Sequence, residues 1–303
     1  MPSFRKAILA IVLSLCLVGA AVAEIRVQHK QGELQLQQVP QRVVTFDIGV
    51  LDSLDALGID VLGVPKDFLP PHLAHYADAR YQQIGSLFEP DFEALAALQP
   101  DLIIIGGRSA PSYRQLNRLA PTLDLSHEFT DFLPDFYRNM RILGQVFDKE
   151  AEVEARLAQI DAQLEDTRAL AEHVENGLVI ITSGGRVSAN GQGSRTGWLH
   201  EHLGIVPAAD NLKEGTHGDP VSFEFILKTD PDYLFVLDRD SAINAGTDAA
   251  RALLDNELIH QTRAWQNNRV IYLNPQIWYV TVAGLNATPA MIEEVHDALD
   301  GAH

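Results

Sequence analysis

The feature that most constrains the fold is a long stretch without glycine or proline in the middle of the chain. It covers residues 148–174 and is rich in Glu, Ala, Leu, Gln and Arg. Its apolar residues recur at steps of three and four: Val153, Leu157, Ile160 and Leu164. This spacing puts one apolar stripe along a single helix. Because a helical connection is stiffer than a loop, we predict a linking helix over 148–174 that holds two halves of the chain nearly fixed.

Each half alternates short β-branched segments with helical segments. Strands are predicted at 42–46, 61–64 and 101–105, and again at 177–181, 233–236 and 270–273; helices are predicted at 49–57, 91–98 and 289–299. Such alternation is typical of parallel sheets covered by helices. The predicted fold class is therefore α/β, with an N-terminal lobe over 24–147 and a C-terminal lobe over 175–303. Since ligands of α/β sheets bind beyond the carboxyl ends of the strands, we expect a ligand cleft between the lobes.

The first 23 residues have the pattern of a secretory signal peptide. Arg5 and Lys6 precede an apolar stretch, and Ala-Val-Ala at 21–23 gives a cleavage site before Glu24. The alternatives are a retained membrane anchor, for which the apolar part is short, and a lipid attached to Cys16, for which Leu15 is too bulky. We predict an exported protein that begins at Glu24.

The charge of the mature chain excludes several classes of partner. Removing residues 1–23 takes away two positive charges, Arg5 and Lys6, so the formal charge goes from −18 to −20. Such an acidic surface repels nucleic acid and anionic lipid. The only cysteine, Cys16, leaves with the signal peptide, so no disulfide is expected. A site for an anionic ligand would need a local cluster of arginines.

Three arginines could form that cluster, because each follows a predicted strand. Arg108 follows 101–105, Arg195 follows the strand at 177–181 after a glycine-rich run, and Arg239 follows 233–236. A single arginine in such a place is usually a solvated surface residue. Three at strand ends in an acidic chain favour binding of ionised oxygens, which the planar guanidinium fork suits.

The glycine-rich run around Arg195 allows two other interpretations. Residues 190–197 read NGQGSRTG, which resembles a dinucleotide-binding loop, but the spacing is wrong and the run lies in the middle of the chain. It could also be a flexible turn before a helix. We favour a loop in which the glycines let Arg195 approach a ligand.

A histidine and a tyrosine are candidate iron ligands. His217 lies on a loop of small residues, EGTHGDP at 214–220, with no second ligand at the spacing of a local zinc motif. Trp278 and Tyr279 follow the strand at 270–273. Nearby arginines favour the phenolate form of tyrosine, and phenolate and imidazole both bind iron. The alternative is that Trp278 and Tyr279 are core aromatics. The pairs His72/His75 and His200/His202 are interpreted as surface residues.

With these residues in view, the mature chain resembles the periplasmic binding proteins for ferric catecholate siderophores, within the class that has a helical backbone between its lobes. The resemblance rests on these runs: GSLFEPDFE (85–93), GGRS (106–109), SRTG (194–197), HGDPVSFE (217–224), DR (238–239) and WY (278–279). The run at 217–224 and the WY pair are similar to the subgroup that takes tetradentate ligands with two catechols. The chain departs from the family at 280–284, VTVAG, where a glycine-rich run is common.

The resemblance implies a role for each of these residues. His217 and Tyr279 would fill the two iron positions that two catecholates leave open, with Trp278 beside them. Arg108, Arg195 and Arg239 would face the catecholate oxygens. Iron would be carried as Fe(III) in the siderophore complex, with no permanently bound cofactor.

The resemblance also implies partners and a location. Glu89 and Glu224, one in each lobe, would dock a periplasmic, monomeric protein onto the permease dimer of an ABC transporter in the inner membrane. It implies a binding protein and not an enzyme. A haem carrier of the same fold is the first alternative, and a periplasmic hydrolase that uses His217 with Asp219 or Glu224 is the second.

Overall fold

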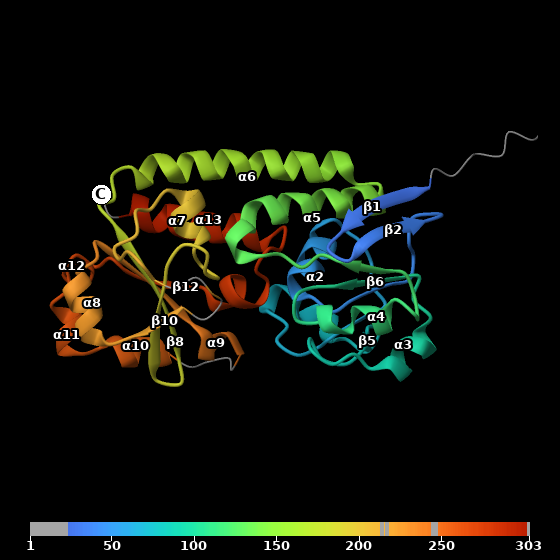
Figure 1. Ribbon diagram of the computed structural model, residues 1–303, viewed down its shortest axis with the longest axis horizontal. Helices are drawn as coiled ribbons and strands as arrows, with labels where there is room; N and C mark the ends of the chain where they lie inside the picture. Colours follow the sequence, from blue (N-terminus) through green and yellow to red (C-terminus); the bar gives the residue numbers. More distant parts are fainter. Residues whose placement is uncertain (1–23, 213–214, 216–217, 244–247, 302–303) are drawn as a thin grey trace, which may run out of the picture.

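The computed structural model consists of two α/β lobes under one long helix (Figure 1). It describes residues 24–301 except 213–214, 216–217 and 244–247. The signal peptide predicted at 1–23 lies outside these residues, as does His217. None of the described helices is both long and apolar enough to span a membrane.

The N-terminal lobe is built on a five-stranded sheet in the order β5-β4-β3-β6-β7, in which every pairing is parallel. The strands are β3 (Val43–Thr45), β4 (Gly63–Val64), β5 (Gln82–Gln83), β6 (Leu102–Ile105) and β7 (Thr122–Asp124). The helices are α2 (Ile48–Ala56), η2 (Pro71–Ala77), α3 (Phe92–Leu98), η3 (Ala110–Ser112), α4 (Tyr113–Leu116), η4 (Phe129–Asp131) and α5 (Phe132–Phe147). A separate antiparallel hairpin, β1 (Ile25–His29) and β2 (Gly32–Leu36), packs beside α5.

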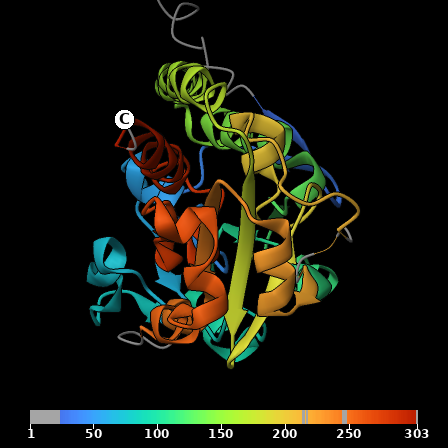
Figure 2. The same cartoon turned by 90° about the vertical axis from the view of Figure 1, so that its left-hand side faces the viewer.

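The C-terminal lobe has a mixed five-stranded sheet in the order β10-β9-β8-β11-β12. Its strands are β8 (Gly177–Ser183), β9 (Arg186–Asn190), β10 (Asp219–Val221), β11 (Tyr233–Asp238) and β12 (Val270–Leu273). The helices are α7 (Trp198–Leu203), α8 (Phe223–Thr229), α9 (Arg239–Ile243), α10 (Ala249–Leu254), α11 (Glu257–His260), α12 (Arg263–Gln266), η5 (Gln276–Val280) and α13 (Ala287–Asp300). Figure 2 turns this lobe toward the viewer and shows its strands between helices on either side.

The sheets are buried on both faces, as the β-branched strands predict. Along β11, Tyr233, Phe235 and Leu237 face α7 and α13, while Leu234 and Val236 face α8, α10 and α11. The first set belongs to an apolar core that continues without a break into the N-terminal lobe through α5 and α6. The two lobes therefore share one core, which limits how far they can move against each other.

The predicted linking helix is confirmed. Helix α6 (Glu150–Ala171) passes over both lobes, with α5 and α13 packed along it (Figure 1). The predicted apolar stripe is the buried face: Val153, Leu157, Ile160 and Leu164. The lobe boundaries at 147/148 and 174/175 remain a prediction.

A second connection ties the C-terminal lobe to α2. The carboxylate of Asp52 is fully buried and accepts hydrogen bonds from the backbone N–H groups of Asn286 (2.8 Å) and Ala287 (3.1 Å), where α13 begins. Gly284 lies against this carboxylate, so that a Cβ atom there would come within 2.3 Å of Asp52. Ala283, in the run where the family often has glycines, has a φ of 65°. Although residues 280–284 lack the family's glycine-rich run, the backbone at Ala283 still adopts a left-handed conformation. Gly284 lies where a side chain would not fit beside Asp52.

Two predictions about elements are wrong in detail. The strand at 177–181 continues to Ser183 and turns back at Gly184 and Gly185 into the antiparallel strand β9. Arg195 therefore follows β9 and not the first strand of this lobe. His200 is also not a surface residue, because its ring is buried and bonded to the carbonyl oxygen of Ile205 at 2.9 Å.

Candidate functional site

The structure brings Arg108, Arg195 and Arg239 together around the ring of Tyr279. Their guanidinium carbons lie 5.9, 4.5 and 5.8 Å from the centre of that ring, respectively. Arg108 comes from the N-terminal lobe and the other three residues from the C-terminal lobe. These are distances at which a cation interacts with an aromatic face. The predicted arginine cluster is thus present between the lobes.

Hydrogen bonds fix the orientation of Tyr279 within this cluster. Arg239 donates from Nε to the Tyr279 hydroxyl oxygen at 2.9 Å, which raises the pKa of the Arg239 guanidinium. Arg239 also donates from Nη1 to the hydroxyl oxygen of Ser183 at 3.0 Å. Arg108 donates to the backbone carbonyl of Tyr279 at 3.4 Å. Both the side chain and the backbone of Tyr279 are therefore held by arginines.

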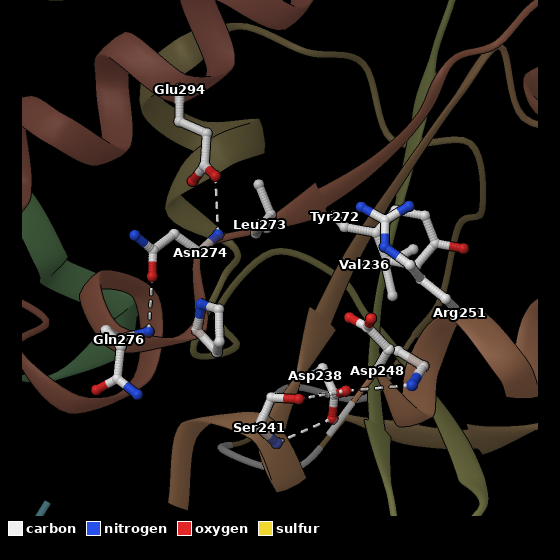
Figure 3. Close-up of a pocket in the computed structure, with 12 residues that line it drawn as sticks. Val236, Asp238, Ser241, Asp248, Arg251, Tyr272, Leu273, Asn274, Gln276 and Glu294 are labelled. Atoms are coloured by element: carbon white, nitrogen blue, oxygen red, sulfur yellow. Dashed lines mark hydrogen bonds between the residues drawn. The ribbon is translucent and has the colours of Figure 1, made fainter. Parts of the chain in front are cut away.

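Arg239 is placed by the carboxylate of Asp238 at the end of β11. That carboxylate accepts hydrogen bonds from the N–H groups of Asp240 (3.1 Å), Ser241 (3.2 Å) and Ala250 (3.1 Å). Figure 3 shows Asp238 at a cavity of 480 Å³ that is also lined by Ser241, Ala250, Arg251 and Tyr272. Of the predicted site residues that the structure describes, none lines this cavity. The Asp238 carboxylate instead fixes the turn from which Arg239 extends.

Arg195 is the most buried of the three arginines, with 8% of its surface exposed. Its guanidinium carbon lies 4.7 Å from the centre of the Phe129 ring and 4.5 Å from that of Tyr279. Burial is the largest cause that lowers the pKa of Arg195 to about 10; the positive charges of Arg108 and Arg239 contribute to this lowering, and Tyr279 opposes it. Arg195 thus remains protonated at neutral pH, but at a cost in free energy.

The glycines on either side of Arg195 allow close packing. At Gly197 a Cβ atom would lie 2.6 Å from the carbonyl oxygen of Gly191. The Ser194 hydroxyl donates to that same oxygen at 2.6 Å, and the Gly193 N–H donates to the Glu201 carboxylate at 2.7 Å. The loop is therefore held in place at the start of α7, which argues against the alternative of a flexible turn; that its glycines let Arg195 approach a ligand stays a prediction.

Trp278 does not face the cluster, contrary to what its position beside Tyr279 suggested. Its side chain is 1% exposed and its Nε1 donates to the Glu294 carboxylate at 2.7 Å. Its ring stacks on Trp198 at 5.2 Å, and Trp198 stacks on Phe132 of the N-terminal lobe at 5.1 Å. This column of three rings supports the cluster from the core side: Trp198 is three residues from Arg195, and Trp278 directly precedes Tyr279.

Two pockets flank the pair formed by Tyr279 and Arg239. A pocket of 280 Å³ is lined on one side by Ser183, Arg186, Ser188, Ile181 and Pro220. A pocket of 160 Å³ is lined on the other side by Phe68, Leu87, Phe88, Ile243, Val280 and Arg108. His217 lies outside the described residues, but Pro220, three residues after it, belongs to the first pocket.

Sequence reasoning missed several of these pocket residues. Arg186 lies after the Gly184–Gly185 turn, and recognising the hairpin from its Gly-Gly dipeptide would have placed it at this edge of the sheet. Phe68 and Phe88 lie on loops where no periodicity marks them. Within the part of the chain that the structure describes, no three His, Cys, Asp or Glu side chains gather as a metal site.

Glu89 and Glu224, the two predicted docking residues, are both exposed. Glu89 lies in a turn closed by Gly85, where a Cβ atom would meet the Glu89 carbonyl oxygen at 2.3 Å. Glu224 lies in the first turn of α8, after the capping residue Ser222. A hydrogen bond with Ser222 lowers the pKa of the Glu224 carboxyl, so this group is ionised at neutral pH.

Comparison with known proteins identifies the family. Residues 43–277 match the periplasmic binding protein family. This chain belongs to that family. The family member petrobactin-binding protein YclQ of Bacillus subtilis is 41% identical over 282 residues, which are 91% of this chain and 89% of YclQ. The crystal structure of YclQ superposes with a TM-score of 0.87 over 91% of this chain and 99% of its own.

Two further members of the family come from Vibrio species. The ferric-anguibactin-binding protein FatB of Vibrio anguillarum is 31% identical over 277 residues, 89% of this chain and 86% of FatB. The crystal structure of the periplasmic catecholate-siderophore binding protein VctP from Vibrio cholerae is 35% identical and superposes with a TM-score of 0.85, over 90% of this chain and 99% of its own. The predicted family and its two-lobed α/β fold are therefore confirmed.

Proposed function

We propose that this protein binds a ferric siderophore with two catecholate groups in the periplasm and delivers it to an ABC permease for iron uptake. The relatives named for petrobactin, anguibactin and catecholate siderophores support this class of ligand. The observation that carries the proposal is the arginine cluster. Among the described residues, no acidic side chain forms an ion pair with Arg108, Arg195 or Arg239.

The electrostatics of the cluster favour an anionic ligand. Three like charges around one ring repel each other, and the lowered pKa of Arg195 reflects that repulsion together with burial. A ferric bis-catecholate carries net negative charge and many ionised oxygens. Binding it would relieve the repulsion and form charged hydrogen bonds, which are each worth about 1.5–3 kcal/mol.

We propose Tyr279 and His217 as the protein's ligands to the incoming iron. Two catecholates occupy four of the six positions of Fe(III) and leave two open. The Tyr279 ring lies among three arginines, and a phenolate oxygen is a ligand that suits Fe(III). The loop at 214–220 leads into β10, whose Pro220 lines the pocket beside Tyr279. A siderophore with three catechols leaves no position open, so these two side chains favour tetradentate ligands.

The proposal is tested by titrating the mature protein with ferric complexes of two-catechol, three-catechol and hydroxamate ligands and with haem, following tryptophan fluorescence. We expect the two-catechol complex to bind most tightly. Arg108→Gln, Arg195→Gln and Arg239→Gln should each weaken it about tenfold or more. Arg251→Gln is the control, because Arg251 packs on Tyr272 outside the cluster. Preferred binding of haem, with its Soret band, or unchanged affinity in all three variants would overturn the proposal.

The proposed location has a separate test. Cleavage after Ala23 should give a mature protein that begins at Glu24, which mass spectrometry of the periplasmic fraction measures directly. A lipid on Cys16 would contradict it.

A further inference from the structure

The two pockets beside Tyr279 differ in chemistry. On one side the side chains of Ser183, Arg186 and Ser188 offer hydroxyls and a guanidinium. On the other side Phe68, Leu87, Phe88 and Ile243 form an apolar surface, with Arg108 at its inner end. The pair Tyr279–Arg239 belongs to both pockets and separates them. A ligand centred on this pair therefore meets a guanidinium and two hydroxyls, beside the apolar Ile181 and Pro220, on its polar side and a mainly apolar surface on the other.

The polar side has an additional cation. Arg186 is exposed, and within the described residues its side chain forms no hydrogen bond or ion pair. Together with Arg239 it provides two guanidinium groups on this side, next to the hydroxyls of Ser183 and Ser188. Ionised oxygens are the groups that these donors bind.

The apolar side exposes aromatic rings that a folded protein normally buries. Phe88 is 60% exposed and Phe68 is 42% exposed, and both rings line the same 160 Å³ pocket. Phe68 and Phe88 come from the N-terminal lobe and Ile243 from the C-terminal lobe. Exposed apolar surface gathered at a cleft is typical of a ligand-binding groove.

The backbone at Phe68 is a second, independent observation. Phe68 has a φ of 62°, in the left-handed region that bulky residues rarely adopt. Such strain persists where the surrounding structure imposes it and is concentrated at binding sites. A glycine or an asparagine would adopt this conformation at lower cost. The chain instead has a phenylalanine there, and the left-handed turn brings its ring to the cleft.

We infer that the apolar pocket binds the spacer between the two chelating arms of the siderophore, and that this spacer is a polymethylene chain. This inference rests on the proposed function and specifies its ligand. The ferric centre lies at Tyr279 and Arg239, the outer oxygens of the chelating groups face Arg186 and the serines, and the methylenes lie on Phe68, Phe88 and Ile243. The arginine cluster thus recognises charge, while the two phenylalanines discriminate among siderophores by spacer.

The experiment compares two synthetic ligands that differ only in the spacer. Both carry two catechol amides. One has an unbroken methylene chain and the other has the same number of chain atoms with two ether oxygens in place of methylenes. The charge-transfer spectra of the free ferric complexes establish that both form the same two-catechol centre. Each buried methylene is worth about fourfold in Kd. We expect the wild-type protein to bind the polymethylene complex about tenfold more tightly.

The variants assign this preference to the pocket. Phe68→Ala and Phe88→Ala should weaken binding of the polymethylene complex and leave binding of the ether complex almost unchanged. The ratio of the two Kd values, which measures the preference, should therefore fall toward one. Phe88→Leu should restore most of it. Phe92→Ala is the matched control, since Phe92 is 37% exposed on α3 but lies outside the pocket. Phe68→Gly removes the ring while relaxing the left-handed backbone, so a loss of preference in this variant is not due to misfolding.

Two results would overturn the inference and leave the proposed function intact. One is equal affinity of the wild-type protein for both complexes. The other is an equal loss for both complexes in Phe68→Ala and Phe88→Ala, which would show that the rings support the site without contacting the spacer. If the wild-type protein binds neither complex, the proposed function itself fails.

Discussion

Arg239 and Tyr279 are joined by a hydrogen bond of 2.9 Å from the guanidinium Nε to the phenol oxygen. The Tyr279 oxygen, which is proposed to bind iron, is therefore held by Arg239, which is proposed to bind the oxygens of the siderophore. Arg108 reaches the backbone of the same tyrosine from the other lobe. Tyr279 is thus held by arginines from both lobes, and its position depends on both.

Replacing Tyr279 by phenylalanine tests its role at iron. Tyr279→Phe keeps the ring and its contacts with three guanidinium groups but removes the phenol oxygen that is proposed to bind the metal. We expect the phenolate part of the visible charge-transfer band to disappear from the two-catechol complex. Affinity for the three-catechol complex should change little. Tyr272→Phe, which alters another tyrosine packed under an arginine, is the control. An unchanged spectrum in Tyr279→Phe would place the iron elsewhere.

The buried charge of Arg195 leads to the prediction that removing it stabilises the protein and weakens ligand binding. Its pKa, lowered to about 10 from 12.5, means that the folded state disfavours the charged form. The penalty applies at every pH below about 10, including neutral pH, and is on the order of 3 kcal/mol. Arg195→Met keeps the apolar stem and removes the charge. Thermal unfolding of the empty variant should therefore occur a few degrees higher, at about 2–4 °C per kcal/mol, while affinity falls at least about tenfold. A lower melting temperature would show that Arg195 stabilises the empty site.

The parts of the fold that depend on local patterns were predictable. The stripe from Val153 to Leu164 predicted α6, because steps of three and four residues put side chains on one face whatever lies around them. The β-branched runs predicted both sheets for a similar reason. The hairpin β8–β9 was not predicted, since its turn is marked only by Gly184 and Gly185, and a glycine pair is also typical of loops.

The site was predictable only in part, because burial and partners depend on contacts between distant residues. Arg108, Arg195 and Arg239 could be grouped since all follow strands of sheets that face one cleft. Trp278 could not be assigned to the core, because what buries it is Trp198, eighty positions earlier. The same limit applies to Phe68, whose left-handed backbone has no signal in the sequence. His72 is a surface residue, as interpreted, but its bond to the buried Asp52 at 2.8 Å joins residues 20 positions apart and had no signal in the sequence.

This contact of His72 predicts a pH dependence of stability. The hydrogen bond that the His72 ring donates to the Asp52 carboxylate raises the pKa of His72 above its usual value, and burial opposes it; the charges of Asp52 and Asp55 add to the rise. A raised pKa in the folded state means that protonation stabilises the fold below about pH 6.5, and that this gain is lost as the pH rises through the folded-state pKa. The His72 side chain is 40% exposed, so we expect less than about 1 kcal/mol.

The measurement is urea unfolding at pH 5.5 and pH 8 for wild type and His72→Gln. The variant should lose stability relative to wild type at pH 5.5 and much less at pH 8. Buried His200, whose pKa is lowered by desolvation, acts with the opposite sign in both proteins and cancels in this difference. His296→Gln is the control, since His296 is half-buried on α13 and its ring bonds to the exposed carboxylate of the neighbouring Asp297. Equal effects of His72→Gln at both pH values would contradict the prediction.

The presentation of Glu89 and Glu224 suits a role in docking. Each lies just before or within the first turn of a helix, in a segment whose backbone is fixed by side chains. The Ser86 hydroxyl accepts the N–H groups of Phe88 (3.2 Å) and Glu89 (3.0 Å), and that of Ser222 accepts the N–H of Phe225 (3.3 Å). Because the lobes share one core under α6, the distance between the two carboxylates is nearly constant. Two arginine-bearing surfaces on a permease dimer could therefore bind the carboxylates of Glu89 and Glu224 at the same time.

We accordingly predict that Glu89→Ala and Glu224→Ala leave ligand affinity unchanged and lower iron uptake by cells. Opposite charges at the rim of an interface steer encounter and fix orientation more than they add affinity, so each single variant should reduce uptake in part. The double variant should lose more, because one remaining carboxylate cannot set the orientation on a dimer. Glu93→Ala with Glu257→Ala is the matched control: both are exposed glutamates in the first turns of other helices, α3 and α11. Uptake is measured with the radiolabelled ferric siderophore at equal periplasmic levels of each protein. Normal uptake by the Glu89/Glu224 double variant, or an equal loss in the control, would show that docking depends on other residues.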